Sequence, residues 1–117
     1  IESLLSGWGC EVSAVQTEAQ ARSTVHQGFQ PQVVVSDYRL GQGTDGLRVI
    51  ATLRYLMDRP VAACLMSGDS DTEMLQAAKM AGLTVLHKPV RPAKLRAFLR
   101  RMALAANTEN PTAEAED

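Results

Sequence analysis

Two uninterrupted apolar runs limit most strongly what this chain can fold into. "VVV" at residues 33–35 and "VAACLM" at residues 61–66 do not alternate with polar residues. A strand that is buried on one face alternates between apolar and polar side chains, whereas a strand without this alternation is buried on both faces. Such strands occur mainly in parallel sheets that helices cover on each side. The two runs therefore predict the central part of a parallel α/β sheet.

Segments with helical periodicity separate and follow these runs. Thr17 and Gln20 have the spacing of a capping box, which predicts a helix from about Glu18 to Gln27. Ser70 and Glu73 have the same spacing and predict a second helix start. Between the two runs, apolar residues recur at the spacing of one helix face: Leu47, Ile50, Leu53 and Met57.

Two further strands and a last helix extend the pattern. "CEVSAV" at residues 10–15 and "LTVLHK" at residues 83–88 are predicted strands, and Pro92 is tolerated in the first turn of a final helix. Strands that alternate with helices, without tight hairpin turns, are joined by right-handed βαβ crossovers. The sequence thus predicts an α/β fold: a three-layer αβα sandwich around a flavodoxin-like, doubly wound parallel sheet.

Composition and charge narrow the class of protein. A length of 117 residues with 45% hydrophobic content fits one domain. The formal net charge of -1, with no Lys/Arg cluster beyond Arg100 and Arg101, argues against direct binding of nucleic acid. The longest apolar run is too short to span a bilayer, so we expect no membrane contact by this segment. Cys10 and Cys64 lack the spacing of metal ligands and are expected to be reduced thiols of a cytoplasmic protein.

Polar residues end three of the predicted strands. Asp37, Ser67 with Gly68, and Lys88 fall at strand ends, and a parallel sheet gathers those ends at one edge, where the functional crevice lies. Carboxylates are known covalent nucleophiles, and an ammonium with a hydroxyl donor would match the charge of a phosphoryl group. Gly68 would leave room for that group. Each side chain also has a structural interpretation, as a loop cap, a turn former or a surface cation, but their joint placement favours a phosphoryl-acceptor site.

At these residues the chain resembles the receiver domain of two-component response regulators, over residues 1–106. The loop "DYRLGQGTDG" after Asp37 matches the family pattern, although Gly41 stands where many members have proline. The segment "LHKPVRPAKLRAFL" looks most like the corresponding segment in receivers of hybrid histidine kinases. The resemblance implies that Asp37 is the phosphoacceptor, Ser67 the switch hydroxyl and Lys88 the phosphate-pairing lysine, with Gly68 beside the phosphate and a cis Lys88-Pro89 bond.

The resemblance also implies a cofactor and partners. Mg²⁺ would be bound by Asp37 and by the backbone carbonyl of Arg39. The partner would be a histidine kinase or a histidine phosphotransfer domain. The sequence leaves open whether the chain also forms a homodimer. The domain would transfer phosphoryl groups within a phosphorelay, with at most weak self-catalysed phosphatase activity. Any kinase activity would lie in another domain of the parent protein.

Two departures from the family pattern affect these expectations. The acidic pair that binds Mg²⁺ after the first strand has no counterpart, because the sequence begins in what would be the first helix; the first strand is therefore expected to be missing from this chain. Val85 stands where many members have an aromatic residue. Residues 107–117 are polar and acidic and are expected to form a disordered tail.

Two other classes of function remain open from the sequence. A pseudo-receiver would bind a partner through the surface from Met74 to Arg101 without phosphorylation; the intact acceptor, hydroxyl and lysine argue against it. A flavodoxin-like enzyme or nucleotide binder would need a glycine-rich phosphate loop that opens a helix, and the sequence has none.

Overall fold

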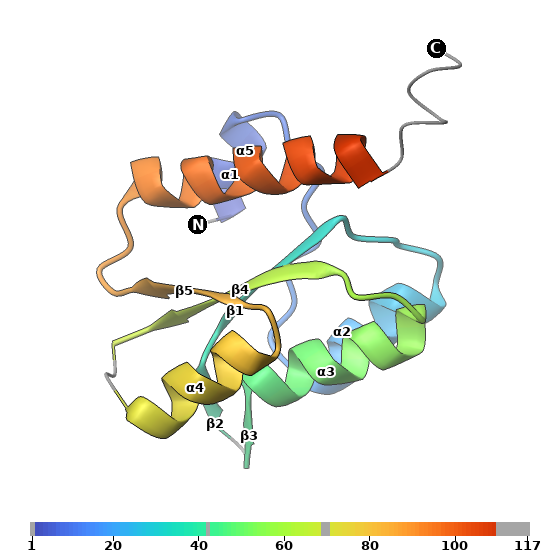
Figure 1. Ribbon diagram of the computed structural model, residues 1–117. Helices are drawn as coiled ribbons and strands as arrows, with labels where there is room; N and C mark the ends of the chain where they lie inside the picture. Colours follow the sequence, from blue (N-terminus) through green and yellow to red (C-terminus); the bar gives the residue numbers. More distant parts are fainter. Residues whose placement is uncertain (1, 42, 69–70, 110–117) are drawn as a thin grey trace.

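The computed structural model describes residues 2–41, 43–68 and 71–109, without the side chains of 104–109. From residue 33 onward, the strands of the main sheet alternate with helices (Figure 1). In order, the elements are α1 (Glu2–Gly7), α2 (Glu18–His26), β1 (Val33–Asp37), β2 (Arg39–Gly41), β3 (Thr44–Asp45), α3 (Gly46–Met57), β4 (Ala62–Ser67), α4 (Thr72–Met80), β5 (Thr84–His87) and α5 (Pro92–Glu109).

The main sheet is parallel, as the apolar runs predict. Its strand order is β1-β4-β5, with Asp37 opposite Met66 and Ser67 opposite His87. The central strand β4 is the most deeply buried, and Cys64 and Leu65 have no exposed surface. The short strands β2 and β3 form a separate antiparallel pair directly after β1.

Helices cover both faces of the sheet and give three layers (Figure 1). On one face, Leu95 and Phe98 of α5 pack with Cys64 and with partly buried residues of α1. On the other face, Ile50 of α3 and Met74 of α4 pack against β4. Ala21 of α2 joins a third cluster with residues of α3. The predicted αβα sandwich is confirmed.

Helix starts follow the capping signals in one case and depart from them in another. The Thr17 side chain accepts a hydrogen bond from the backbone N–H of Gln20 at 3.1 Å, as the capping box predicts. The N-cap of α4 is Asp71, whose carboxylate accepts from the N–H of Glu73 at 2.9 Å. Ser70, the predicted cap, lies outside the described residues. A side chain two residues before Glu73 therefore caps this helix.

The prediction of a strand at residues 10–15 is wrong. This segment has no regular secondary structure, and all of its residues except Val12 are exposed. A strand requires a neighbour that pairs with its backbone N–H and C=O groups. In the described part of the chain, β1 pairs only with β4, so the other edge of β1 has no strand beside it, and residues 10–15 belong to neither sheet. The sheet is thus incomplete relative to a flavodoxin-like sheet.

The last helix extends beyond the expected domain boundary. Helix α5 runs to Glu109, so the first residues of the expected tail are helical, and residues 110–117 lie outside the described structure. Across the described ranges, no helix is long and apolar enough to cross a membrane.

Candidate functional site

Asp37 and Lys88 are brought together from the two outer strands of the main sheet. Asp37 ends β1 and Lys88 directly follows β5, with β4 between them. The Nζ atom of Lys88 lies 2.7 Å from Oδ1 of Asp37, and the side chains are 49% and 43% exposed. The site therefore presents a solvent-accessible carboxylate that already has a cation as its partner.

A backbone hydrogen bond to the end of β4 positions Lys88. The backbone N–H of Lys88 donates to the carbonyl oxygen of Ser67 at 2.8 Å, and the Lys88-Pro89 peptide bond is cis, as the family resemblance implied. Ser67 itself is only 3% exposed. Gly68 is exposed, and no atom lies within 4 Å of where its β-carbon would be. The predicted hydroxyl and glycine thus follow Met66, the residue that pairs with Asp37.

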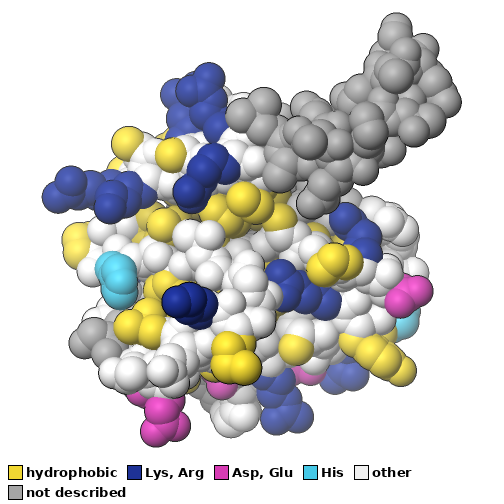
Figure 2. Space-filling model, viewed as in Figure 1, with side chains coloured by type: hydrophobic (Ala, Val, Ile, Leu, Met, Phe, Trp, Pro, Cys, Tyr) yellow, Lys and Arg dark blue, Asp and Glu magenta, His cyan; other side chains and the backbone are white. Residues whose placement is uncertain are grey.

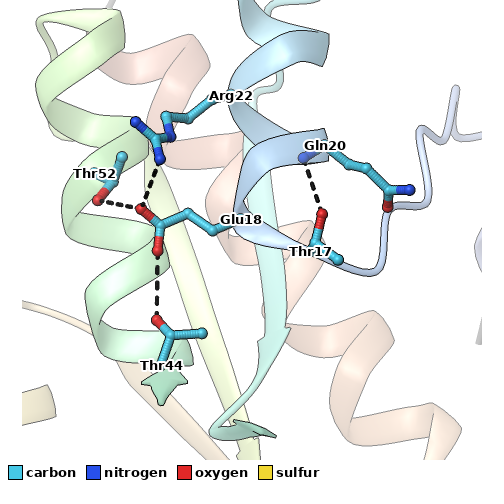
Figure 3. Close-up of polar contacts among 6 residues, drawn as sticks. All are labelled: Thr17, Glu18, Gln20, Arg22, Thr44 and Thr52. Carbon is cyan, nitrogen blue, oxygen red and sulfur yellow. Dashed lines mark hydrogen bonds and ion pairs between the residues drawn. The ribbon is translucent and has the colours of Figure 1, made fainter. Parts of the chain in front are cut away.

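The loop after Asp37 is a small hairpin that neighbouring helices anchor. Thr44 of β3 donates to Oε1 of Glu18 at 3.4 Å, and Thr52 of α3 donates to Oε2 at 3.5 Å. Arg22 lies 3.8 Å from the same carboxylate (Figure 3). One side chain of α2 therefore links the hairpin to α3. These hydrogen bonds are long, so each contributes modestly.

Gly46 and Ser36 also form the site, and the site prediction from the sequence missed them. A β-carbon on Gly46 would overlap the carbonyl oxygen of Asp37 and would lie 2.6 Å from Cδ2 of Leu65. The Ser36 hydroxyl donates to the same Asp37 carbonyl at 2.8 Å. The N–H of Gly46 donates to the carbonyl of Tyr38 at 2.8 Å. The only sequence signal is the pair "DG" at the start of α3, which does not reveal this close approach.

A hollow of about 440 Å³ opens beside the Asp37 and Lys88 pair. Apart from this pair its lining is mostly apolar: Leu4, Met66, Pro89, Val90, Pro92 and Leu95. The lining comes from α1, from β4, from the segment between β5 and α5, and from the start of α5. An approaching group could thus contact an apolar wall and the carboxylate together.

The described residues do not form a complete Mg²⁺ site. Mg²⁺ requires six oxygen ligands in octahedral geometry, commonly one or two carboxylates together with waters and phosphate oxygens. Within residues 2–41, 43–68 and 71–109, no group of three or more His, Cys, Asp and Glu residues could hold a metal ion. Asp37 and the carbonyl of Arg39 would supply two of the six ligands, and Oδ1 of Asp37 is paired with Lys88.

The fold and the strand-end site together define a class of protein. Residues 1–100 match the sequence profile of the response regulator receiver domain. The chain belongs to this family, whose members are domains of two-component signal transduction. Receiver domains generally have a histidine kinase or a phosphotransfer protein as partner and are typically Mg²⁺-dependent.

Solved structures have the same fold. A CheY-like receiver domain protein from Methanospirillum hungatei JF-1 is similar with a TM-score of 0.81 and 18% identity, over 93% of this chain and 86% of that chain. A receiver protein from Sinorhizobium medicae WSM419 has a TM-score of 0.73 and 27% identity, over 86% and 80% of the two chains. One from Pseudomonas putida has a TM-score of 0.72 and 26% identity, over 83% and 80%. A comparison with curated proteins gave no match.

Proposed function

We propose that Asp37 accepts a phosphoryl group from a phosphohistidine, and that the chain acts in a phosphorelay. The observation that carries the proposal is the 2.7 Å contact between Lys88 Nζ and Asp37 Oδ1 at an accessible strand end. Membership of the receiver family supports it. A carboxylate that only capped a loop would not need an exposed lysine from the far side of the sheet as its partner.

The chemistry is a transfer between a nitrogen and an oxygen. A carboxylate oxygen of Asp37 attacks phosphorus, and the bond between phosphorus and the imidazole nitrogen breaks. The electron pair of that bond goes to the nitrogen, and the ring leaves as neutral imidazole when its other nitrogen carries a proton. Lys88 would offset the charge on the phosphoryl oxygens, and the carboxylate and ammonium need little movement to do so. Slow hydrolysis of the acyl phosphate by water would be the weak phosphatase activity.

Mg²⁺ would assist this transfer by neutralising phosphoryl charge. Asp37 and the Arg39 carbonyl are the ligands that this chain would contribute. The remaining ligands would have to come from waters, from the phosphoryl group and from residues outside those described. Dependence of labelling on Mg²⁺ is therefore part of the proposal.

We further propose that the domain relays or stores phosphoryl groups and does not drive a strong conformational output. Val85 of β5 is half-buried and packs against the cluster of Ile50, Leu65 and Met74. A β-branched side chain has one strongly preferred rotamer, so it has few alternative positions by which to report phosphorylation at Asp37. The resemblance to receivers of hybrid histidine kinases agrees with this role.

A mass measurement separates this function from that of a pseudo-receiver. The full chain is incubated with phosphoramidate and Mg²⁺ and its intact mass is recorded. A gain of one phosphoryl group supports the proposal, whereas an unchanged mass at saturating donor supports the pseudo-receiver.

For the relay role, a time course of back-transfer to a histidine phosphotransfer domain is recorded alongside amide chemical shifts of α4 and α5. Back-transfer with small shifts is expected; large shifts without back-transfer would indicate an effector-type switch.

A further inference from the structure

Positive charge is concentrated in one part of the chain. Residues 74–108 contain none of the chain's 13 Asp and Glu residues. The same stretch contains seven of its 12 Lys and Arg residues: Lys79, Lys88, Arg91, Lys94, Arg96, Arg100 and Arg101. Because the formal net charge of the whole chain is only -1, the overall charge hides this segregation.

Six of these residues surround the last helix, and we call them the α5 basic surface: Lys88, Arg91, Lys94, Arg96, Arg100 and Arg101. All six are exposed. Leu95 and Phe98 face the sheet, so the basic side chains of α5 itself lie away from this buried face, and Lys88 and Arg91 lie in the segment just before the helix. Figure 2 shows Lys and Arg side chains over the upper part of the molecule, where α5 runs, and further ones across the middle and lower parts of this face, where the visible Asp and Glu side chains also lie.

Within the part of the chain whose side chains the structure describes, the charge of this surface is largely uncompensated. Among the described residues, Lys88 is the only member that pairs with a carboxylate. Arg96 lies over the ring of Trp8, which directly follows α1, with its Cζ atom 5.6 Å from the ring centroid, a contact that holds the guanidinium without neutralising it. Like charges repel one another, and an acidic partner would relieve this repulsion and speed encounter.

The α5 basic surface is continuous with the candidate phosphoryl site. Lys88 belongs to both, and the hollow beside Asp37 is lined by Pro92 and Leu95 of the first turns of α5. A protein that covers the first turns of α5 would also reach this hollow and the carboxylate. The position of the charge therefore suits a partner that delivers something to Asp37.

We propose that the α5 basic surface docks an acidic face of the protein that donates the phosphoryl group. This inference rests on the proposed function. A second copy of the chain is a poor occupant, because a two-fold symmetric interface would place this surface against itself and bring like charges together. An acidic protein face complements the charge and leaves the apolar hollow for contacts near the phosphohistidine.

The test uses a helical peptide with a row of glutamates along one face as the probe, titrated into ¹⁵N-labelled full chain. Amides of α5 should shift, and binding should weaken as salt is added. The charge-reversal variant Lys94→Glu/Arg101→Glu should lose about tenfold or more in affinity, because it replaces attraction by repulsion. The control Arg48→Glu/Lys79→Glu makes the same change in net charge on α3 and α4 and should stay within about twofold.

Several outcomes would overturn the inference. The first two are an absence of amide shifts in α5 and an equal loss of peptide affinity in the control variant. The others are tighter binding of α5 to phosphatidylserine vesicles or duplex DNA than to the peptide, and dimerisation of the unmodified chain through α5. Labelling of Asp37 by phosphoramidate should be the same in the charge-reversal variant and in the unmodified chain. If the unmodified chain is not labelled, the proposed function fails, whatever the peptide shows; loss of labelling only in the variant would contradict a role confined to docking.

Discussion

Gly46 at the start of α3 lies directly against the backbone of Asp37, with no space for a side chain between them. A β-carbon would overlap the carbonyl oxygen of Asp37 and crowd the Leu65 side chain. We expect Gly46→Ala to destabilise the fold by about 1–3 kcal/mol through overpacking. Because the overlap falls on the acceptor residue, phosphoramidate labelling should also slow. Urea unfolding and labelling rates on the same sample measure both effects.

Gly7→Ala is the matched control for this substitution. Gly7 ends α1, and no atom lies within 4 Å of its β-carbon position. Its replacement by alanine should leave stability unchanged or raise it by up to about 1 kcal/mol, because alanine has the higher helix propensity. Equal destabilisation by the two variants would contradict the account of Gly46.

Lys88→Ala should affect chemistry far more than stability. Both partners of the ion pair are about half exposed, so its loss should change the free energy of unfolding by less than about 1 kcal/mol. If Lys88 offsets charge on the transferred phosphoryl group, labelling should slow by about tenfold or more. Lys79→Ala removes an exposed lysine from α4 and should alter neither quantity. Unchanged labelling by the Lys88 variant would remove this residue from the mechanism.

Arg54 links α3 to the end of α4 and to the chain before β4. Its Nε atom donates to the carbonyl of Val61 at 3.0 Å, and its Nη1 atom donates to the carbonyl of Ala81 at 2.7 Å. We expect Arg54→Met to destabilise the fold by about 1–3 kcal/mol, because two carbonyl groups lose a charged donor. Arg48→Met, which removes an exposed arginine of the same helix, should stay within about 0.5 kcal/mol. Denaturant unfolding measures the free energy of unfolding of both variants, and equal m-values make the two values comparable. Equal destabilisation by the two variants would contradict the role of Arg54.

The sequence predicts best the elements whose burial requires a particular pattern of apolar residues. The runs at 33–35 and 61–66 became β1 and β4 because strands covered on both faces need apolar side chains at every position. The segment 10–15 was also predicted as a strand but has no strand. Pairing depends on a neighbouring strand, and a local pattern contains no information about that neighbour.

For the site, the sequence predicts the residue types better than the contacts. Strand ends placed Asp37, Ser67 and Lys88 at one edge, and the structure joins Lys88 to Asp37 directly. The close approach of Gly46 to Asp37 could not be predicted, since it depends on how α3 enters against β1 in three dimensions. The hairpin of β2 and β3 was also missed, because its few residues carry too short a pattern to show periodicity.

Burial of Cys64 predicts a pH dependence at the alkaline end. Cys64 has no exposed surface, and burial raises the pKa of its thiol from 9.0 to about 12. Above pH 9 the unfolded chain releases this proton while the folded chain retains it, so the stability contribution is complete below pH 9 and is lost as the pH rises toward about 12. Cys64→Ala should lose less stability over this window than the unmodified chain. Equal pH dependence of their free energies of unfolding would contradict this origin.

The most direct test of the account is to locate the phosphoryl group. The full chain and its Asp37→Asn variant are incubated with phosphoramidate and Mg²⁺, and intact mass and peptide mass identify the labelled residue. Asp58→Asn is the control, because Asp58 is exposed in a left-handed conformation with φ of 54° that asparagine tolerates. The account predicts one phosphoryl group on Asp37 in the unmodified chain and in the control, and none in Asp37→Asn with its fold intact. Labelling that persists in Asp37→Asn, or that maps to another carboxylate, would contradict it.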